Sequence, residues 1–281
     1  IHLLQMLNIL ERWDLQSLGH NSAAYIHRLV ESMRRAYADR SAYLGDPDFY
    51  SVPVKQIIDK SYAKKLRRQI NLKQAGFSSN VLPGLPIDPK TLVKGVKKAG
   101  AESIETTHIS TWDQWGNVVS TTTTLNFSFG SGIAVSGAGF LLNNEMDDFS
   151  AKPGSPNGYG LIGGVANEIQ PGKRPLSAMT PTIVFDQKGA PILATGSPGG
   201  STIITAVLQV LLNVLEFDMG IADATAAPRI HHQWLPDRIG YEPGISPDTL
   251  NLLKGMGHSL DDKPRILGST QTVHKGPNGS T

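Results

Sequence analysis

The chain changes character at one stretch near the end of its first half, which reads ETTHISTWD at residues 105–113. Thr107 to Trp112 alternates in polarity and is rich in strand-forming residues, and the β-branched run Val118 to Leu125 follows. Asp113 to Asn117 separates the two runs and has the composition of a turn. Two such runs around a turn predict a β-hairpin, here beginning at Thr106.

The sequence before the hairpin predicts helices followed by an irregular linker. Apolar residues at helical spacing cover residues 1–13, and a second helix is expected from a cap at Asn21 or Ser22 to about Asp39. Residues 39–48 are expected to form a polar loop, and residues 59–72 a short basic helix. Residues 74–105 contain prolines, glycines and lysines without periodicity. A loop of this length is unusual inside a domain, which favours a mobile segment leading to Thr106.

The sequence after the hairpin predicts further strands and helices. The expected elements are strand-like runs at 132–142, 182–185 and 192–195, loops over 143–174, and helices at 202–215, near 221–226 and at 247–256 with Ser246 as cap. This order of hairpin, loops, hairpin and helices favours an α+β layered sandwich with mainly antiparallel strands over a parallel doubly wound sheet.

The composition excludes several classes of protein. With 281 residues, 40% hydrophobic and 18% charged, the chain is expected to be an ordinary globular protein with one large domain or about two smaller ones. A net charge of +2 with dispersed Lys and Arg argues against a nucleic-acid partner. The absence of cysteine excludes disulfides, thiolate zinc sites and a cysteine nucleophile. No run approaches the roughly 20 apolar residues of a membrane span.

Both ends of the chain are expected to lie inside a longer protein. Ile1 already belongs to a helical pattern and no initiator Met precedes it. At the other end, Gly276-Pro277-Asn278-Gly279 is a turn signal that normally leads into another strand. We therefore expect a fragment.

Three motifs invite functional interpretations that their context does not support. Gly158 to Gly163 has the spacing G-x-G-x-x-G, but no strand precedes it and no helix follows, so we reject a dinucleotide site and expect a flexible surface flap. His231 and His232 would point to opposite faces of a strand, which favours a structural role over metal binding. Asp46-Pro47-Asp48 is expected to be a turn and not a metal site.

Two further loops carry groups suited to binding. Gly199 and Gly200 precede the helix expected at 202–215, and their backbone N–H groups could face a developing negative charge, as in an oxyanion hole. A plain tight turn fits the same residues equally well. In the run from Asn143 to Ser150, Glu145 and Asp148 stand beside amides, which suits recognition of an ammonium group, although capped loops share this composition.

Thr106 has a chemical logic of its own. A threonine hydroxyl is a weak nucleophile without a base, and the free α-amine of an N-terminal threonine, with an ordinary pKa of about 7.7–8.0, can be that base. Thr106 would become N-terminal if the Glu105–Thr106 peptide bond were cut, for instance by attack of Thr106 Oγ on the Glu105 carbonyl. An ordinary strand start is the alternative.

Taken together, the motifs resemble those of gamma-glutamyltranspeptidases (glutathione hydrolases). The resemblance covers essentially the whole chain, in the order and spacing of that family. It is carried by residues 36–40, 43–47, 106–110, 124–126, 141–150, 173–177 and 195–200.

The resemblance implies an N-terminal-nucleophile hydrolase with a four-layer αββα sandwich, here incomplete at both ends. It implies self-cleavage at Glu105–Thr106, with residues 1–105 as the end of a large subunit and residues 106–281 as a C-terminally truncated small subunit, the two sharing one fold. The processed heterodimer would transfer γ-glutamyl groups from glutathione or related compounds to water, an amino acid or a dipeptide, without metal or cofactor. The family's location implies the periplasm, the exterior or the cell surface.

The resemblance also implies roles for individual residues. Thr106 would form the γ-glutamyl ester, Thr124 would hydrogen-bond near the new terminus, and the Gly199 and Gly200 amides would form the oxyanion hole. The substrate α-amine would be held by Asn126, Glu145 and Asp148. Ser177 would contact the substrate α-carboxylate, and Tyr159 lies in the segment Pro153–Gly164, which resembles a lid.

Two departures and two alternatives accompany this interpretation. Ala178 stands where many members have a second serine, and the family's arginine for the substrate carboxylate belongs to a part of the large subunit before this chain. One alternative is a glutaryl or β-lactam acylase of the same fold, against which Asn126 and Asp148 argue, because those acyl groups carry no α-amine. The other is a non-catalytic amino-acid-binding homologue that never frees Thr106.

Overall fold

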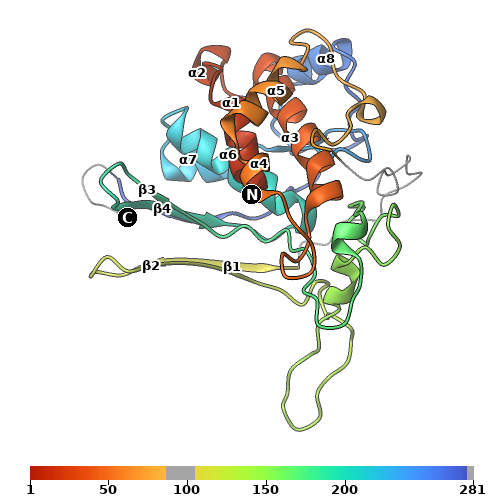
Figure 1. Ribbon diagram of the computed structural model, residues 1–281. Helices are drawn as coiled ribbons and strands as arrows, with labels where there is room; N and C mark the ends of the chain where they lie inside the picture. The colour runs from red at the N-terminus through yellow and green to blue at the C-terminus, as the bar shows by residue number, and fades with distance from the viewer. Residues whose placement is uncertain (87–104, 277–281) are drawn as a thin grey trace. The chain divides into compact units, whose positions relative to one another are not determined.

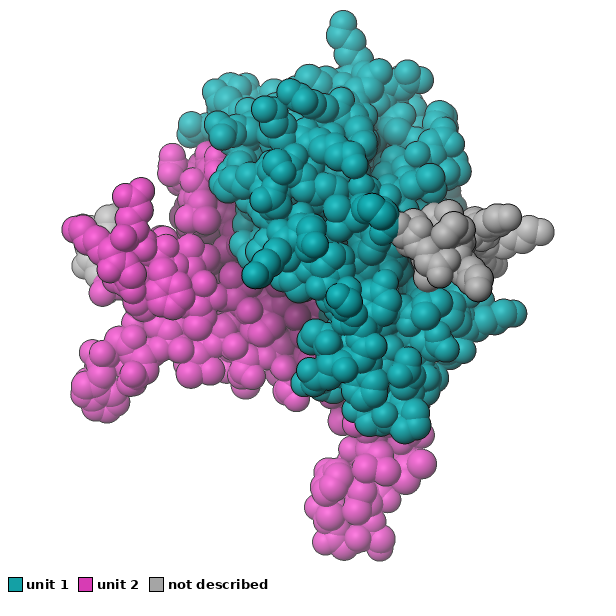
Figure 2. Space-filling view, in the orientation of Figure 1, with its two compact units in different colours: residues 1–102, 145–177, 230–265 teal, residues 103–144, 178–229, 266–281 magenta. Residues whose placement is uncertain are grey.

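The computed structural model describes residues 1–86 and 105–276, and the chain divides into two compact units (Figure 1, Figure 2). Unit 1 comprises Ile1–Glu102, Glu145–Ser177 and Ile230–Arg265. Unit 2 comprises Ser103–Asn144, Ala178–Arg229 and Ile266–Thr281. Most of the expected linker, residues 87–104, and the turn expected at 276–279 beyond its first residue lie outside the described residues.

Unit 1 is mainly helical. Its helices are α1 (His2–Leu10), α2 (Leu15–Leu18), α3 (Ala23–Tyr43), α4 (Val54–Ile57), α5 (Lys60–Arg68) and α8 (Pro247–Gly255), with 3-10 turns η1 (Ser78–Asn80), η3 (Glu145–Asp148) and η4 (Val165–Asn167) and the short strands β5 (Ile230–His231) and β6 (Gly240–Tyr241). The predicted basic helix is amphipathic: α5 buries Tyr62 and Leu66 against Ile9 of α1. Its lysines and arginines therefore lie on the other faces.

Helix α3 is the element around which unit 1 is built, since it contacts α1, α2, α8 and β5. Ser22 caps it by accepting a 3.1 Å hydrogen bond from the Tyr25 N–H, as predicted. The expected helix end near Asp39 is wrong, because the helix continues to Tyr43 through residues that include neither Gly nor Pro. Buried Asp39 is tolerated there because it accepts hydrogen bonds from Gln5, from Tyr62 and from the Gly84 N–H.

Unit 2 carries the sheets. The predicted hairpin is confirmed as β1 (Thr107–Trp112) and β2 (Val118–Thr123), which pair in antiparallel register with Thr107 opposite Thr123. A second antiparallel sheet has the order β3-β4-β7, formed by β3 (Thr182–Phe185), β4 (Pro191–Gly196) and β7 (Gln271–His274). The 3-10 turn η5 (Gly200–Thr202) and helices α6 (Ile203–Leu215) and α7 (Ile221–Ala226) complete the unit.

Unit 2 is layered. The hairpin packs on one face of the second sheet, against β4 and β7, while α6 contacts β4 and α7 contacts β7 (Figure 1). Helices α6 and α7 lie close to their predicted positions, and all but the last residue of α6 is buried, as its continuous apolar run indicated. Antiparallel sheets with helices make the fold α+β, as predicted. The four-layer arrangement stays a prediction.

The strand expected at 132–142 does not form. Ala134 and Leu141 form an isolated antiparallel bridge in this stretch. Gly132, Gly137 and Gly139 have φ values of 73°, 77° and 74°, which lie in the left-handed region and interrupt extended backbone. Among the described residues, none of the helices combines the length and apolarity needed to cross a bilayer.

Candidate active site

Thr106 stands at the start of β1 and is half-buried. Its hydroxyl donates a 3.1 Å hydrogen bond to Thr124 Oγ1. The pair continues the β1–β2 register by one step beyond Thr107 and Thr123. The Asn126 backbone N–H also donates to Thr124 Oγ1, at 2.9 Å. Unit 2 thus brings together three of the residues that the sequence singled out, with Thr124 as their common acceptor.

Asn126 is buried and held in an uncommon conformation. Its φ of 75° lies in the left-handed region, which asparagine tolerates better than most residues. Its side-chain Nδ2 donates to the Asn144 carbonyl at 3.3 Å, and Asn144 Oδ1 accepts from the Phe127 N–H at 3.1 Å. These bonds orient the amide at the turn that ends the hairpin.

Gly199 and Gly200 form the turn between β4 and α6, and both are buried. Their φ values are 132° and 54°, which side chains with a Cβ rarely adopt. The Thr202 N–H and hydroxyl donate to the Gly199 carbonyl at 3.0 and 2.7 Å. Within the described residues, no acceptor is recorded for the Gly199 and Gly200 N–H groups, so the tight turn also presents two donors of the kind an oxyanion hole needs.

Glu145 and Asp148 lie on the same 3-10 turn, η3, in unit 1. Burial and the neighbouring Asp148 carboxylate raise the pKa of Glu145 to about 7. Burial also raises the pKa of Asp148, while Glu145 and the positive charge of Arg40 act in the opposite direction. Near neutral pH the Glu145 carboxyl group is therefore partly protonated, because burial and the neighbouring Asp148 both disfavour its ionisation. A cation arriving beside them would favour the doubly ionised form.

Arg40 is a functional candidate that the sequence interpretation missed, because it was assigned to a loop. It is buried on the last turn of α3 and donates to the carbonyls of Leu176 and Ser177 at 3.4 and 3.3 Å. Arg40 and Asp148 also line the same small cavity, of about 20 Å³. The run from Ala36 to Ala42 contains three alanines and neither Gly nor Pro, and this is the signal that could have placed it on a helix.

The remaining predicted residues lie on loops of unit 1 and, for Ala178, at the start of the second segment of unit 2. Ser177 is exposed and Ala178 is half-buried. Tyr159 is buried, its backbone carbonyl accepts from Gln233 Nε2 at 3.2 Å, and the preceding Gly158 N–H donates to Asp147 Oδ2 at 2.9 Å. Leu161 and Ile162 are buried as well, so this segment packs against its unit more closely than the surface flap we expected.

The other motifs have structural explanations. The segment from Gly158 to Gly163 has neither strand nor helix beside it, in agreement with rejection of a dinucleotide site. The Asp46 backbone carbonyl accepts from the N–H groups of Phe49 and Tyr50, which confirms the turn. Hydrogen bonds from Arg174, at 2.6 and 2.9 Å, hold the pKa of Asp46 well below its usual range.

His231 and His232 have separate partners. His231 Nε2 lies 2.9 Å from Gln233 Oε1, and His232 Nε2 lies 3.2 Å from Asp237 Oδ1. Both imidazoles are buried. The structural role predicted for this pair fits these contacts.

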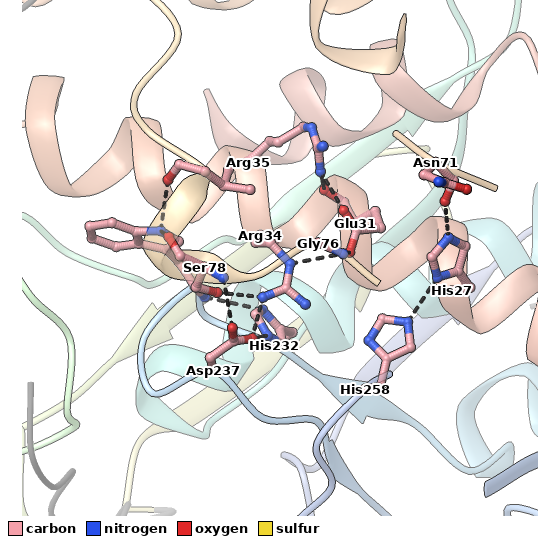
Figure 3. Close-up of polar contacts among 12 residues, drawn as sticks. His27, Glu31, Arg34, Arg35, Asn71, Gly76, Ser78, His232, Asp237 and His258 are labelled. Carbon is pink, nitrogen blue, oxygen red and sulfur yellow. Dashed lines mark hydrogen bonds and ion pairs between the residues drawn. The ribbon is translucent and has the colours of Figure 1, made fainter. Parts of the chain in front are cut away.

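His27, Glu31 and His258 form a cluster within unit 1 that the sequence did not indicate (Figure 3). His27 Nε2 lies 2.7 Å from the Asn71 carbonyl, so it carries a proton, and Nδ1 accepts from His258 Nε2 at 2.8 Å. Both imidazoles are then neutral. Burial, and next the repulsion that a protonated His27 would exert, lower the pKa of His258 to about 3.

The spacing of this trio resembles a metal site, but its electrostatics oppose one. Glu31 already accepts from Arg34 Nε at 3.2 Å, Arg35 Nη1 at 2.6 Å and the Gly76 N–H at 2.9 Å. A divalent cation would displace the proton between the imidazoles and stand beside two buried guanidinium groups. Burying additional uncompensated charge is costly, so we interpret the cluster as structural.

Comparison with known proteins gives a consistent result. A model of the gamma-glutamyltranspeptidase family matches residues 1–280. The glutathione hydrolase proenzyme of Escherichia coli K12 is 50% identical over 99% of this chain and 46% of its own length. The acylase ACY 1 proenzyme of Pseudomonas sp. SE83 is 34% identical over 100% of this chain and 45% of its own length.

A solved structure extends the comparison to the fold. The crystal structure of an acivicin-inhibited gamma-glutamyltranspeptidase is 53% identical and covers 60% of this chain and 89% of its own, with a TM-score of 0.58. Its description assigns critical roles in autoprocessing and catalysis to its C-terminus. The chain studied here spans about half the length of the curated relatives it matches.

Proposed function

Since this chain belongs to the gamma-glutamyltranspeptidase family of N-terminal-nucleophile hydrolases, we propose that its protein cleaves itself at Glu105–Thr106 and then transfers γ-glutamyl groups. The hydrogen bond from the Thr106 hydroxyl to Thr124 Oγ1 is the observation that carries the proposal. It orients the hydroxyl of the residue immediately before β1, where cleavage at Glu105–Thr106 would create an N-terminal nucleophile.

Self-cleavage begins with the Thr106 side chain. The hydroxyl hydrogen points at Thr124, which leaves the Oγ lone pairs for attack on the Glu105 carbonyl carbon. The Glu105–Thr106 C–N bond breaks as the acyl group moves to Oγ, and the proton that Oγ loses passes to the nitrogen, which becomes the α-amine. Water then hydrolyses this ester, which gives a Glu105 carboxylate and a free Thr106 hydroxyl.

The new α-amine makes Thr106 a catalyst. It accepts the hydroxyl proton while Oγ attacks the γ-carbonyl carbon of glutathione or a related γ-glutamyl compound, and it passes that proton to the departing amine. The Gly199 and Gly200 N–H groups would stabilise the oxyanion. Water, an amino acid or a dipeptide then takes the γ-glutamyl group from the ester. The processed enzyme would be a heterodimer of a large and a small subunit.

Charged groups of unit 1 would select the donor. Glu145 and Asp148 would bind the substrate α-ammonium group, together with Asn126, because a nearby cation offsets the burial, and for Glu145 also the repulsion by Asp148, that raise the pKa values of these carboxyl groups. Ser177 and the backbone at Ala178 would contact the α-carboxylate. Tyr159, on the segment 153–164, would cover the bound substrate.

The test uses the protein as its gene encodes it, including any residues that flank these 281. Mass spectrometry should find two chains separated at Glu105–Thr106, while a Thr106→Ala variant stays whole and forms no glutamyl ester. A Thr106→Ser variant is the matched control, since it keeps the hydroxyl and should still be cleaved. A Glu105–Thr106 bond that stays intact after prolonged incubation would refute the proposal.

The 34% identity to an acylase proenzyme supports a second candidate, an acylase acting on glutaryl side chains. The two activities differ in whether the preferred substrate carries an α-amine. Activity should be measured on a γ-glutamyl amide and on the glutaryl amide that lacks only this amine. Preference for the glutaryl compound would favour the acylase, and binding of glutamate by an uncleaved protein would favour a non-catalytic homologue.

A further inference from the structure

His108 lies two residues after Thr106 in the hairpin, and the His108–Thr122 pair is the next pair on the same face as Thr106 and Thr124. Strand residues two apart share a face, so Thr106, His108 and Ser110 point the same way. His108 is opposite Thr122, and Ser110 is opposite Ser120. These inward-facing residues are buried or half-buried, whereas Thr107, Ile109 and Thr111 on the other face are exposed. The face of the hairpin that carries Thr106 is therefore a layer of hydroxyl groups around one imidazole.

Every polar atom of the His108 ring has a partner. Nδ1 lies 2.7 Å from Thr122 Oγ1. Nε2 lies 2.9 Å from Ser110 Oγ and 3.4 Å from Ser120 Oγ. The ring is 4% exposed, so these bonds satisfy groups that would otherwise be buried without partners.

The hydrogen bonds determine which nitrogen carries the proton. Ser110 Oγ donates to the Gln271 carbonyl of β7 at 3.0 Å, and Ser120 Oγ donates to the Thr195 carbonyl of β4, also at 3.0 Å. Because both hydroxyl hydrogens are committed, these two oxygens accept from His108, and Nε2 carries the proton. Nδ1 then holds a lone pair and accepts the Thr122 hydroxyl. His108 is neutral, and its tautomer is set from both sides.

The imidazole also lies directly on the end of β4. A Cβ atom added to Gly196 would lie 2.1 Å from His108 Cε1, so this glycine permits the contact. Gly196 is the last residue of β4, three positions before Gly199. The same ring therefore touches the strand that leads to the paired glycines and adjoins the step that holds Thr106.

We propose that His108 is a positioning residue that aligns the Thr106–Thr124 pair with the glycine turn at 199–200. The proposal rests on the function proposed above for Thr106. His108 exchanges no proton with substrate. Its neutral ring holds Thr122 on one side and Ser110 and Ser120 on the other, so that β1, β2 and β4 keep one relative placement during self-cleavage and acyl transfer.

Two substitutions of His108 separate the hydrogen bond at Nδ1 from those at Nε2. His108→Asn can place an acceptor near the Nδ1 position and so keep the Thr122 bond, while it loses the donor to the serines. His108→Gln can place a donor near Nε2 and keep the serine bonds, while it loses the acceptor for Thr122. If His108 acts by aligning the Thr106–Thr124 pair, the bond to Thr122 matters more than the bonds to the serines. His108→Gln should then slow the reactions more than His108→Asn. A misplacement of about 1 Å can cost about 100-fold, so we expect roughly 10- to 100-fold slower self-cleavage and a similar loss in kcat.

Thr122→Val removes only the hydroxyl that His108 holds and should slow the same two steps by roughly 10-fold. Thr121→Val makes the same change on the exposed face of the same strand and should leave both rates unchanged. KM for the γ-glutamyl donor should change by less than about threefold in all variants, since the ring does not bind substrate. A purely structural role would instead lower thermal stability without this separation of kcat from KM.

The readouts are the half-time of the Glu105–Thr106 cleavage and steady-state kinetics on the complete natural protein. The wild-type protein should cleave itself and Thr106→Ala should not. If His108→Gln and Thr122→Val then show wild-type rates, the role of His108 is refuted and the proposed function is not. A wild-type protein that never cleaves would overturn the proposed function first. Equal losses in Thr121→Val and Thr122→Val would also refute the role of His108.

Discussion

The polar interiors of the two units are built differently. In unit 2, the layer beneath Thr106 consists of neutral hydroxyl groups and one neutral imidazole, each with a hydrogen-bond partner. In unit 1, helix α3 buries full charges, and Glu31 is paired with Arg34 and Arg35. A layer of neutral groups can hold a nucleophile while the layer itself keeps the same charge as pH changes. A charged interior depends on every ion keeping its partner.

The largest effect is expected from breaking the buried ion pairs of unit 1. Burial alone would raise the pKa of Glu31, but Arg34 and Arg35 lower it to about 2. Glu31→Gln removes the carboxylate that pairs with the buried Arg35 and leaves Arg34 with Asp237 alone, so the free energy of unfolding should fall by about 3–5 kcal/mol. Urea unfolding measures it. The control is Glu11→Gln, which breaks the exposed 2.5 Å pair with Lys60 and should cost less than about 1 kcal/mol. Equal costs would contradict the comparison.

The next effect concerns the charged half of the candidate site. Asp148→Asn should lower kcat/KM on γ-glutamyl substrates by about 100-fold or more, since loss of one partner of a buried charge pair costs about 2–5 kcal/mol. Self-cleavage should change by less than about threefold, because that step involves no substrate amine. Asp147→Asn, on the same turn, is the matched control. Similar damage to both steps would indicate that Asp148 is structural.

Binding should depend on pH through Glu145. Its pKa of about 7 means that the carboxyl group is ionised above that pH and neutral below it. Glutamate binding should therefore weaken as pH falls through about 7, so its inhibition constant should rise. The rise should reach up to about tenfold, which is the effect of losing one charged hydrogen bond. Glu145→Gln should abolish this dependence. The free amine of Thr106 titrates in a similar range but affects kcat. A pH profile unchanged by Glu145→Gln would show that another group is responsible.

The smallest effect is expected in the neutral layer of unit 2. Ser120→Ala removes one acceptor of His108 and one donor to the Thr195 carbonyl, while Ser110 still accepts from the ring. The free energy of unfolding should fall by about 1–2 kcal/mol, as for neutral hydrogen bonds. Ser128→Ala at an exposed position should change it by less than about 0.5 kcal/mol. A loss as large as that of Glu31→Gln would erase the distinction between the units.

Elements with local causes could be predicted from the sequence. The hairpin formed where alternation and a turn coincide, and Asp113 Oδ1 accepts from the Trp115 and Asn117 N–H groups at 2.9 and 2.8 Å. Ser22 and the continuous apolar run of α6 gave helices close to their expected places. The glycine-rich stretch at 132–142 misled us, because its spacing is strand-like while its backbone angles are not.

Contacts between distant segments could not be predicted. Arg34 meets Asp237, which is 203 positions away, and His27 meets His258, which is 231 positions away. No local pattern encodes such pairs, and tertiary burial also overrode the loop expected at 39–43. His108 belongs to the hairpin predicted from the sequence, but its proposed role depends on the serines and the strand end that the fold places around it.

The sequence by itself determined the family, the order of the elements in the hairpin region and the identity of the candidate nucleophile, because these follow from local patterns and motif spacing. Only the tertiary structure decided that Thr106 donates to Thr124, that Arg40 lies beside Asp148, and that His108 is a neutral ring held by three hydroxyl groups. Protonation states and hydrogen-bond directions depend on burial and on partners far away in the chain, and these exist only once the chain has folded.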